Sequence, residues 1–558
     1  MRWVAKICLL VLAPGLVWAQ TTAQNAPSDP TSVAAELKAL REAMAQQQQQ
    51  IAQQQQRIDT LEKALETKTA GTPHVEDAAL HTNTTATTTA VASDMQEKVP
   101  ESPLSFRIGA AEFTPGGFVD FENIFRSTNT TNSSATSFGA IPFSNTVQGH
   151  LTEFRSTGQY SRLNLRVDTT FKENKVRAYV EGDFNGNSAP NVFVGTNPHT
   201  ARLRLYWLDL RRHQWEFLGG SSWGLMTPNR VGVSPMPADL ALGLGEDANV
   251  HVGINHTRAS QFRVVWHPND NFAWAFGIEN PQQFVGNSVV FPTAFNAQLG
   301  SQFDNNSNQA GGTSNPESTG APNVAPDVNT KAAWDSDPRG HHFHAEVGGM
   351  LTTVKITVLA PSNTVGAAFT SHSKTGGGIQ GALNYEFIKN VRFLGNAFWG
   401  NGIGRYLIGL APQAVVVPIN GAGNTCAGAT GCDARPSLVH AGNGTLGVEW
   451  QPSTKTQLGF YYGGVYAQRN TFPDITSAAV TKPFIGFGGP NSANSNNRAI
   501  QQGTVDWNQT FWRNPQYGAV LLIAQASYLT RSPWFVAAGA PKNAHLTMGF
   551  LSIRYVLP

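Results

Sequence analysis

Hydrophobic and polar residues alternate along most of the chain after about residue 104. The alternation is clearest in residues 161–184, where a turn at residues 172–175 separates two stretches. In the first stretch Arg162, Asn164, Arg166, Asp168 and Thr170 alternate with Leu163, Leu165, Val167, Thr169 and Phe171. Because successive side chains of a β-strand point to opposite faces, each predicted strand has one charged face and one apolar face.

The same pattern predicts a long series of strands. They lie at residues 202–209, 214–225, 262–268, 272–279, 344–359, 377–387, 392–399, 444–450, 457–467, 518–530 and 546–556. Three segments rich in Gly, Asn and Pro, at residues 298–337, 412–436 and 484–503, are too long for turns; we expect extracellular loops there, one of which folds inward. A membrane-spanning strand with its connection uses roughly 25 to 30 residues, so residues 104–558 hold about 16 strands.

A different period governs residues 33–66. Apolar residues and two glutamines recur there in steps of four and three: Val33, Leu37, Leu40, Met44, Gln47, Ile51, Gln54, Ile58, Leu61 and Leu65. This heptad seam predicts a coiled-coil oligomerisation stalk whose packing residues are Leu37, Leu40, Met44, Ile51, Ile58, Leu61 and Leu65. The alternative is a Gln-rich helix of low complexity with accidental spacing.

The remaining N-terminal segments are short. Arg2 and Lys6 precede an apolar run at residues 7–17, which predicts a signal peptide at residues 1–19, cleaved after Ala19. Residues 20–32 form an N-terminal segment, and the Thr- and Ala-rich residues 67–103 are predicted to be a disordered linker. Residues 104–558 then form the β-domain.

Composition restricts the class of protein. The chain has 558 residues, of which 41% are hydrophobic and 14% charged, and its net charge is +2, which excludes a disordered chain and a basic nucleic-acid-binding protein. After the signal no run of eighteen apolar residues occurs, so an exported protein of long strands is either a large secreted β-protein or a membrane barrel. Charged residues on one face, and aromatics near strand ends such as Phe171, Trp207 and Trp266, favour the barrel.

Three possible chemical sites carry little weight. Cys426 and Cys432 most simply close a disulfide in a surface loop of an exported protein; the alternative is a two-Cys metal site. His341, His342 and His344 could bind a metal, but adjacent histidines beside a long loop are more often solvated. The residues Gly220-Ser221-Ser222-Trp223-Gly224 match the nucleophile motif of hydrolases, but a turn follows instead of the required helix. We therefore predict no enzyme, no metal and no cofactor.

Several blocks of the chain resemble the DcaP-like family of Gram-negative outer-membrane porins. They are residues 160–166 (Tyr-Ser-Arg-Leu-Asn-Leu-Arg), 181–184, 202–206, 263–266 with 278–281, and 402–406. The resemblance implies a homotrimeric barrel of 16 strands in the outer membrane, with a periplasmic coiled-coil stalk, that admits small anionic solutes such as dicarboxylates. Two departures stand out: the block at residues 219–224 differs from the family's usual Gly-Gln-Thr-Trp-Ser, and the chain ends in Pro558 instead of an aromatic residue.

The expected function is transport by diffusion through a channel lined by arginines, in contact with outer-membrane lipid on its outside. Arginine is permanently charged and presents a planar fork of donors that suits carboxylates. The candidate channel-lining residues are Arg155, Arg162, Arg166, Arg177, Glu181, Asp183, Arg202, Arg204, Arg263 and Arg405. Alternatively these arginines pair with nearby carboxylates and brace the wall. A structural protein that links the membrane to the cell wall, and a barrel-embedded hydrolase, remain as other functions.

Overall fold

The computed structural model describes residues 102–130, 135–186, 200–235, 251–255, 257–304, 325–359, 369–420 and 432–558. All of them belong to one compact unit, Thr84–Pro558. The predicted signal peptide, the N-terminal segment, the coiled coil, the linker up to residue 101 and Cys426 lie outside the described residues. Among the described residues, no helix is long and apolar enough to cross a membrane.

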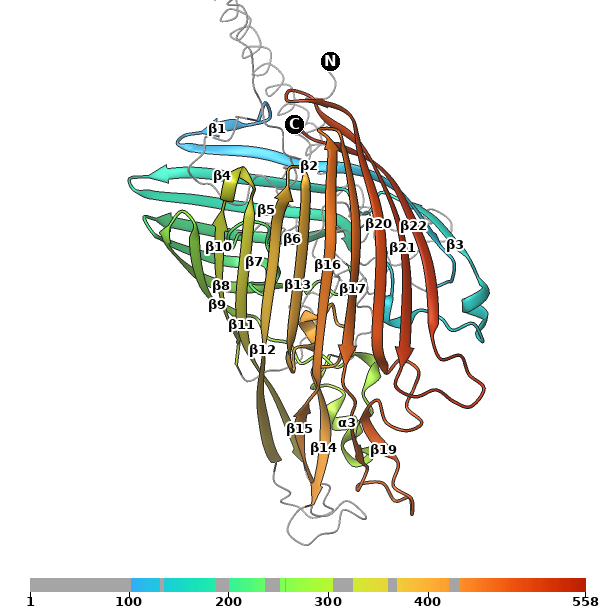
Figure 1. Ribbon diagram of the computed structural model, residues 1–558. Coiled ribbons are helices and arrows are strands. Elements are labelled where there is room, and N and C mark those ends of the chain that lie inside the picture. The colour runs from blue at the N-terminus through green and yellow to red at the C-terminus, as the bar shows by residue number, and fades with distance from the viewer. Residues whose placement is uncertain are drawn as a thin grey trace, which may run out of the picture. The chain divides into compact units, whose positions relative to one another are not determined.

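The unit is a closed antiparallel β-barrel (Figure 1). Its strands are β1 (Phe106–Ile108), β2 (Ala111–Arg126), β3 (Glu153–Thr157), β4 (Arg162–Phe171), β5 (Asn174–Gly186), β6 (Thr200–Arg212), β7 (Trp215–Trp223), β8 (Arg258–Asn269), β9 (Phe272–Glu279), β10 (Asp327–Ser336), β11 (Phe343–Leu359), β12 (Phe369–Ile388), β13 (Val391–Asn401), β16 (His440–Ser453), β17 (Thr456–Ala467), β20 (Asn497–Asn514), β21 (Gly518–Pro533) and β22 (Ala544–Val556). β1 pairs only with β2, and β3 and β4 occupy successive parts of one position, so the ring has 16 strands as predicted.

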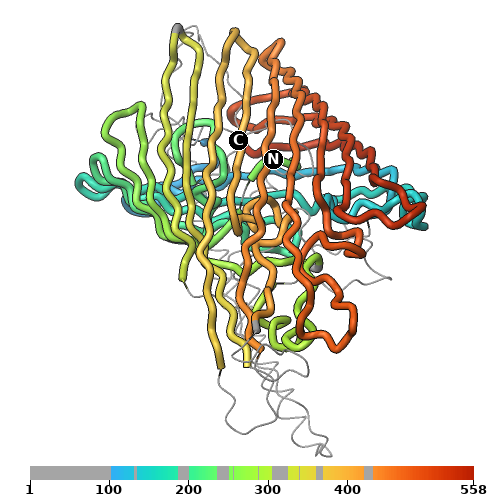
Figure 2. Tube along the Cα trace, turned by 60° about the horizontal axis from the view of Figure 1, so that its bottom comes forward, coloured from blue at the N-terminus to red at the C-terminus, as the bar shows by residue number. Residues whose placement is uncertain are grey.

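The first long strand closes the ring. β2 pairs with β22 on one side, from Phe118↔Val556 to Arg126↔Met548, and with β4 and β3 on the other. Every other strand pairs with its neighbours in chain order, which Figures 1 and 2 show as a continuous wall. Closure pairs the strands of the ring on both sides, so the ring itself has no open sheet edge.

The two rims of the barrel differ in the length of their connections. At one rim the turns are short, for example residues 172–173 between β4 and β5 and residues 213–214 between β6 and β7. At the other rim the connections are long, such as residues 224–257 between β7 and β8 and residues 280–326 between β9 and β10. Outer-membrane barrels have short periplasmic turns and long extracellular loops, so we refer to the two rims as periplasmic and extracellular.

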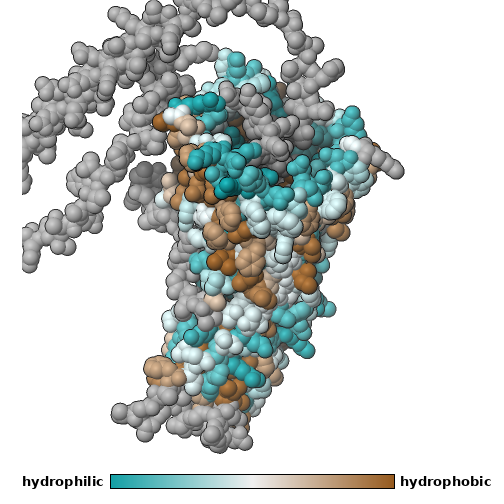
Figure 3. All heavy atoms as spheres, turned by 90° about the vertical axis from the view of Figure 1, so that its left-hand side faces the viewer, coloured by the Kyte–Doolittle hydropathy of each residue, from teal (hydrophilic) through white to brown (hydrophobic). Residues whose placement is uncertain are grey.

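The outer wall is apolar over many strands. Large hydrophobic side chains stand exposed on it, among them Val119, Phe121, Leu163, Leu208, Phe262, Phe276, Leu351, Leu446, Phe460, Val505, Leu551 and Ile553. On the face shown in Figure 3, hydrophobic patches lie below a more hydrophilic area near the top of the view. A soluble monomer rarely exposes so much contiguous apolar surface, whereas a lipid-facing barrel requires it.

Two segments predicted to be loops contain strands. β10 occupies residues 327–336 of the predicted loop 298–337, and β20 begins at Asn497, inside the predicted loop 484–503. In β10 the outward positions include Thr330 and Ala332, which weaken the apolar half of the alternation, while Asp327 and Lys331 face inward. The third predicted loop, residues 412–436, contains β14 (Ala414–Asn420) and β15 (Cys432–Leu438), which pair as a hairpin outside the ring.

Connections at the extracellular rim build a cap with its own core. It comprises β14, β15, β18 (Asn470–Pro473), β19 (Phe484–Phe487), the short helix α3 (Asn296–Leu299) and the ends of β11 and β12, at the bottom of Figure 1. Its buried side chains include Val285, Phe295, Leu299, Val354, Ile356, Val416 and Ala434. The largest apolar cluster of the described residues lies inside the barrel, where loop residues such as Met226, Val252 and Tyr406 pack on the wall.

Candidate functional site: the inner wall of the barrel

The charged faces of β4, β5 and β6 point into the barrel and form an arginine-rich surface, which we call the arginine wall: Arg162, Arg166, Arg177, Arg202 and Arg204 with Asp168, Glu181 and Asp183. The strand period determines this side, because Leu163, Val180 and Leu203, which alternate with these residues, are exposed on the outside. The wall therefore brings together seven of the ten predicted lining residues. Of the other three, Arg155 on β3 lies beside it, and Arg263 and Arg405 lie on β8 and in the turn after β13.

The centre of the arginine wall is a cluster around two carboxylates. Arg202 Nη2 lies 2.7 Å from Asp183 Oδ2. Arg204 bridges both acids, with Nε 2.8 Å from Glu181 Oε1 and Nη1 2.9 Å from Asp183 Oδ2. The Arg202 side chain keeps 18% of its surface exposed, whereas that of Arg204 keeps 6%. The outer arginine of the cluster is thus accessible while the inner one is held by its partners.

Closer to the periplasmic rim, two arginines share one carboxylate. Arg166 Nε lies 2.7 Å and Arg177 Nε 2.6 Å from the two oxygens of Asp168. Both guanidinium side chains remain 15% exposed. Two positive charges thus share one ion-paired carboxylate, while Asp209 lies opposite Arg177 on β6 and Glu112 lies opposite Asp168 on β2.

An aromatic ring lies between two further arginines. The guanidinium of Arg162 lies 5.4 Å and that of Arg554 4.1 Å from the centroid of the Phe118 ring. Arg554 also pairs with Asp120, 2.6 Å between Nη2 and Oδ2. Cation–π contacts of this kind orient a guanidinium without cancelling its charge.

Arg155 and Arg258 lie at the two sides of the arginine wall. Arg155 Nη2 is 3.6 Å from Glu153 Oε1, and its side chain is 30% exposed. The guanidinium of Arg258, the first residue of β8, lies 5.5 Å from the centroid of the Trp223 ring. Sequence reasoning missed Arg258 and Arg554, although Arg554 has inward parity on the last predicted strand.

Arg263 and Arg405 have other surroundings. Arg263 is 1% exposed and donates to the carbonyl oxygens of Val233 and Trp223 at 2.8 and 3.0 Å. Arg405 is 6% exposed; it donates to the carbonyl oxygen of Asn280 at 2.8 Å and its Nη2 lies 3.1 Å from an oxygen of Asp327. Both side chains point inward, but they anchor loops instead of facing open space.

The connection after β7 reaches across the barrel interior. Its described residues 224–235 and 251–255, which we call the inward loop, touch the opposite wall at several points. Lys331 Nζ donates to the carbonyl oxygen of Thr227 at 2.6 Å, and the amide of Asn229 donates to Glu346 at 3.3 Å. Arg230 Nη2 lies 2.5 Å from Glu449 Oε1, and both side chains are almost fully buried. The sequence pointed to three other segments for an inward loop and did not identify this one.

The far end of the inward loop lies directly on the wall. The amide of Val252 donates to Gln502 Oε1 at 3.0 Å, and Asn396 Nδ2 donates to the carbonyl oxygen of Gly253 at 3.0 Å. Gly253 has φ +109°, and a Cβ there would lie 2.2 Å from the carbonyl oxygen of Gly444. Only glycine permits this backbone approach, so the crossing is built into the sequence at this position.

The three minor sites are all structural in the described residues. His344 is buried between Asp335 and Glu346, with its Nδ1 2.8 Å from Asp335 Oδ1. No group of three or more His, Cys, Asp or Glu in the described part of the chain is placed to hold a metal ion. Ser222 is buried on β7 and donates to the carbonyl oxygen of Pro235 at 2.9 Å. Cys432 is disulfide-bonded; its predicted partner Cys426 lies outside the described residues.

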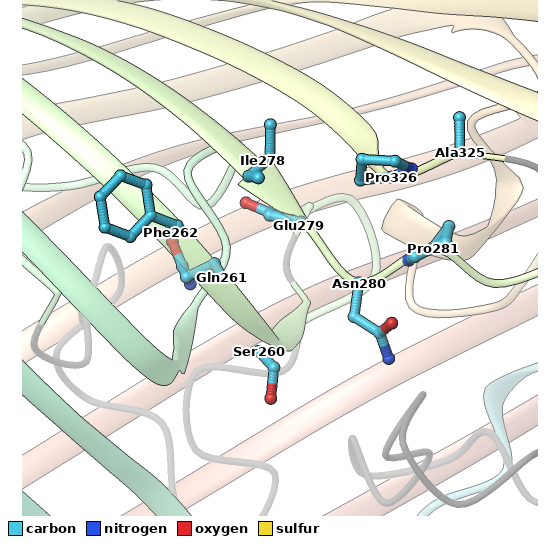
Figure 4. Close-up of a pocket in the computed structure, with 9 residues that line it drawn as sticks. All are labelled: Ser260, Gln261, Phe262, Ile278, Glu279, Asn280, Pro281, Ala325 and Pro326. Atoms are coloured by element: carbon cyan, nitrogen blue, oxygen red, sulfur yellow. The ribbon is translucent and has the colours of Figure 1, made fainter.

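A pocket of about 470 Å³ is lined by the ends of β8 and β9 and by the residues that precede β10. Figure 4 shows its lining, in which Ser260 and Asn280 lie towards the strand ends and Phe262 and Ile278 further along β8 and β9. Phe262 and Ile278 are 51% and 39% exposed, whereas Gln261 and Glu279 in the same lining are buried.

Comparison with known proteins supports the fold. No protein-family model matches the chain, and no curated protein is similar to it in sequence. Among solved structures, the outer-membrane channel DcaP of Acinetobacter baumannii is similar over 81% of this chain and 99% of its own, with a TM-score of 0.52 and 15% identity. OmpT of Vibrio cholerae (TM-score 0.40, 11% identity) covers 81% of this chain and 99% of its own, and OprB of Pseudomonas putida (TM-score 0.40, 9% identity) covers 79% and 94%.

The fold and the inner wall thus define a closed 16-stranded barrel of the kind found in outer-membrane channels. The likeness to DcaP confirms the fold that the sequence resemblance implied, along the whole barrel.

Proposed function

We propose that this protein is an outer-membrane porin that passes small hydrophilic anions, such as dicarboxylates, by diffusion. The observation that carries the proposal is the arginine wall inside a closed barrel whose outside is apolar. Such a barrel is stable only with lipid around it, and its charged interior then faces water. The proposed place is therefore the outer membrane, with outer-membrane lipid around the barrel.

The excess of positive charge at the arginine wall supports the preference for anions. Arg162 and Arg258 both lie within electrostatic reach of Arg204 and Asp183. Together with Arg202 these are four guanidiniums around two carboxylates, Glu181 and Asp183. A low-dielectric wall focuses the field of such a cluster into the lumen, which raises the local concentration of anions.

Geometry favours carboxylates as the ions that pass. Guanidinium groups present planar pairs of donors that match the two oxygens of a carboxylate. Arg155, Arg166, Arg177 and Arg202 keep part of their surface exposed, so they can exchange one carboxylate partner for another along the wall. Arg263 and Arg405 are covered, and we leave them out of the proposed path.

Single-channel recording in a planar bilayer tests this proposal. With chloride, succinate and a neutral sugar as solutes, we expect open channels, a reversal potential that shows anion preference, and current block by succinate but not by the sugar. A protein that inserts without conducting would be a plugged, structural barrel. Equal permeability to cations and anions would remove the arginine wall from the proposed mechanism.

We further propose that three copies associate through a periplasmic coiled coil at residues 33–66. The heptad seam supports this proposal, because a single helix that exposes ten core positions requires partners. Light scattering of the purified protein in detergent should give a trimer, and deletion of residues 33–66 should weaken the assembly while the conductance of each barrel is unchanged. An equally stable trimer without this segment would contradict the role of the stalk.

A further inference from the structure

A row of aromatic residues crosses the outer wall near the extracellular rim. Trp399 on β13 is opposite Gly442, Gly442 is opposite Tyr466, and Tyr466 is opposite Ala499 on β20, so these residues lie at one level of the barrel. Trp399 and Tyr466 are 50% and 37% exposed. Trp399 is two residues from the end of β13, next to a long connection, so the row lies at the extracellular rim.

Glycine at position 442 makes this row continuous. A Cβ on Gly442 would lie 1.8 Å from Cε3 of Trp399, so the indole occupies the space above β16 that a side chain would fill. The indole then stacks on Tyr466, with ring centroids 6.2 Å apart and 9° between the planes. Tyr466 in turn meets Trp534 edge to face, 6.2 Å away, and Trp534 is fixed by its indole N–H to the carbonyl oxygen of Ala467 at 2.9 Å.

Two exposed arginines lie over the last ring of the row. The guanidinium carbons of Arg469 and Arg498 are 5.7 and 6.0 Å from the Trp534 ring centroid. Neither arginine has a hydrogen bond or an ion pair within the described residues. Two positive charges therefore meet at one ring without a carboxylate among the described residues, and this end of the row attracts anions.

We propose that this rim platform, consisting of Trp399, Tyr466, Trp534, Arg469 and Arg498, binds the phosphate groups of lipid headgroups in the outer leaflet. The inference rests on the proposed membrane location. The platform lies between the apolar band, represented by Leu446 and Phe460 on the same strands, and the loops, where headgroups are found. Aromatic rings are suited to this boundary, and arginine forks bind phosphate with two charge-assisted hydrogen bonds.

The test compares two charge-matched double variants of the full-length protein. R469Q/R498Q removes the two platform charges, whereas R435Q/K542Q removes two exposed charges elsewhere on the extracellular side. Each protein is placed in phosphatidylcholine nanodiscs with and without diphosphoryl lipid A, and bound lipid A is measured by native mass spectrometry. We expect R469Q/R498Q to bind lipid A roughly tenfold to thirtyfold more weakly, and R435Q/K542Q to bind it like the natural chain.

Three outcomes would overturn the proposal. One is equal loss of lipid A in both double variants, which would indicate a diffuse charge effect. Another is that the binding of inorganic phosphate depends on Arg469 and Arg498 while the binding of lipid A does not. That result would assign the platform to a soluble anion. The third is cross-linking of two copies through Arg498→Cys, which would assign it to an interface between subunits. Conductance of the same samples separates these outcomes from failure of the channel proposal, because a variant that conducts like the natural chain has an intact barrel.

Discussion

The two halves of the inner wall use charged residues in opposite ways. On the arginine wall, guanidiniums outnumber their carboxylates and several remain 15–30% exposed. On the wall from β10 to β20, the inward loop and the cap cover the charges, and pairs such as Lys331–Glu346 and Arg230–Glu449 are almost fully buried. The comparison teaches that an inward-pointing charge in a barrel stays accessible to solvent only where no loop lies over it.

The physical basis of the difference is desolvation. A buried ion pair contributes little net stability, but removal of one partner leaves an isolated charge in a medium of low dielectric constant. Such pairs therefore hold the loop at one position on the wall. Exposed guanidiniums keep their hydration and interact weakly with any single partner, which suits transient contact with a moving solute.

The largest effect is expected from removing one partner of the buried ion pair Arg230–Glu449, which holds the inward loop. Arg230→Met removes the ion-pair partner of the buried Glu449, so the free energy of unfolding should fall by about 3 kcal/mol or more. The inward loop should also detach and the conductance should rise. Urea unfolding in lipid vesicles and single-channel recording measure the two effects.

The matched control removes both charges of the pair Arg230–Glu449. Arg230→Met combined with Glu449→Gln should recover much of the lost stability, because no unpaired charge remains buried. If the single variant unfolds like the natural chain and conducts the same current, the pair does not hold the loop.

A smaller effect is expected on the arginine wall. Replacing both Arg162 and Arg202 with Gln should lower the ratio of anion to cation permeability roughly fivefold, since a unit charge about 4 Å from an ion is worth about 1 kcal/mol in water. The loss of stability should be smaller than for Arg230→Met, because the buried Asp183 keeps Arg204 as a partner. Reversal potentials in a salt gradient measure the ratio, and Lys542→Gln on an exposed loop serves as the control. A selectivity that is the same in both variants would contradict the proposed path.

Removing a carboxylate from the arginine wall should change the anion preference in the opposite direction. Asp168→Asn leaves Arg166 and Arg177 without their shared partner, so the anion preference should increase by about twofold at low salt and by less at high salt. The same reversal potentials measure this change. A decrease would mean that the two arginines lose their orientation when Asp168 is neutralised.

The smallest expected effect is a dependence of the stability of the cap on pH. Burial raises the pKa of Asp474, but hydrogen bonds from Thr293 and Thr476 outweigh it and hold the pKa below its usual value. Its contribution to stability is therefore complete above about pH 4, near the pKa of an unfolded Asp, and is lost as the pH falls through the lower folded value.

Limited pepsin digestion at decreasing pH measures this effect. Cleavage within residues 283–304 should accelerate only below about pH 4, and in Asp474→Asn it should not change with pH over that range. A natural chain whose cleavage pattern is independent of pH would show that Asp474 does not hold the cap.

Much of the barrel could be predicted from the sequence, because the strand period is local. Leu163 and Arg162 are neighbours, and alternation alone assigns one to the outside and the other to the inside. Prediction failed at β2, β10 and β20; in β10 and β20, Thr, Ala, Asn and Gln replace the larger apolar and charged residues. The inward loop was missed because its partners are remote: Arg230 and Glu449 are 219 residues apart, and no local pattern records their contact.

What the sequence determined by itself is the two-faced character of most strands, and with it a closed β-barrel. Only the tertiary structure decided which arginines stay open and which, like Arg263 and Arg405, are covered by loops. The reason is physical: a strand's period depends on backbone geometry from one residue to the next, whereas burial depends on segments that meet only after the ring has closed.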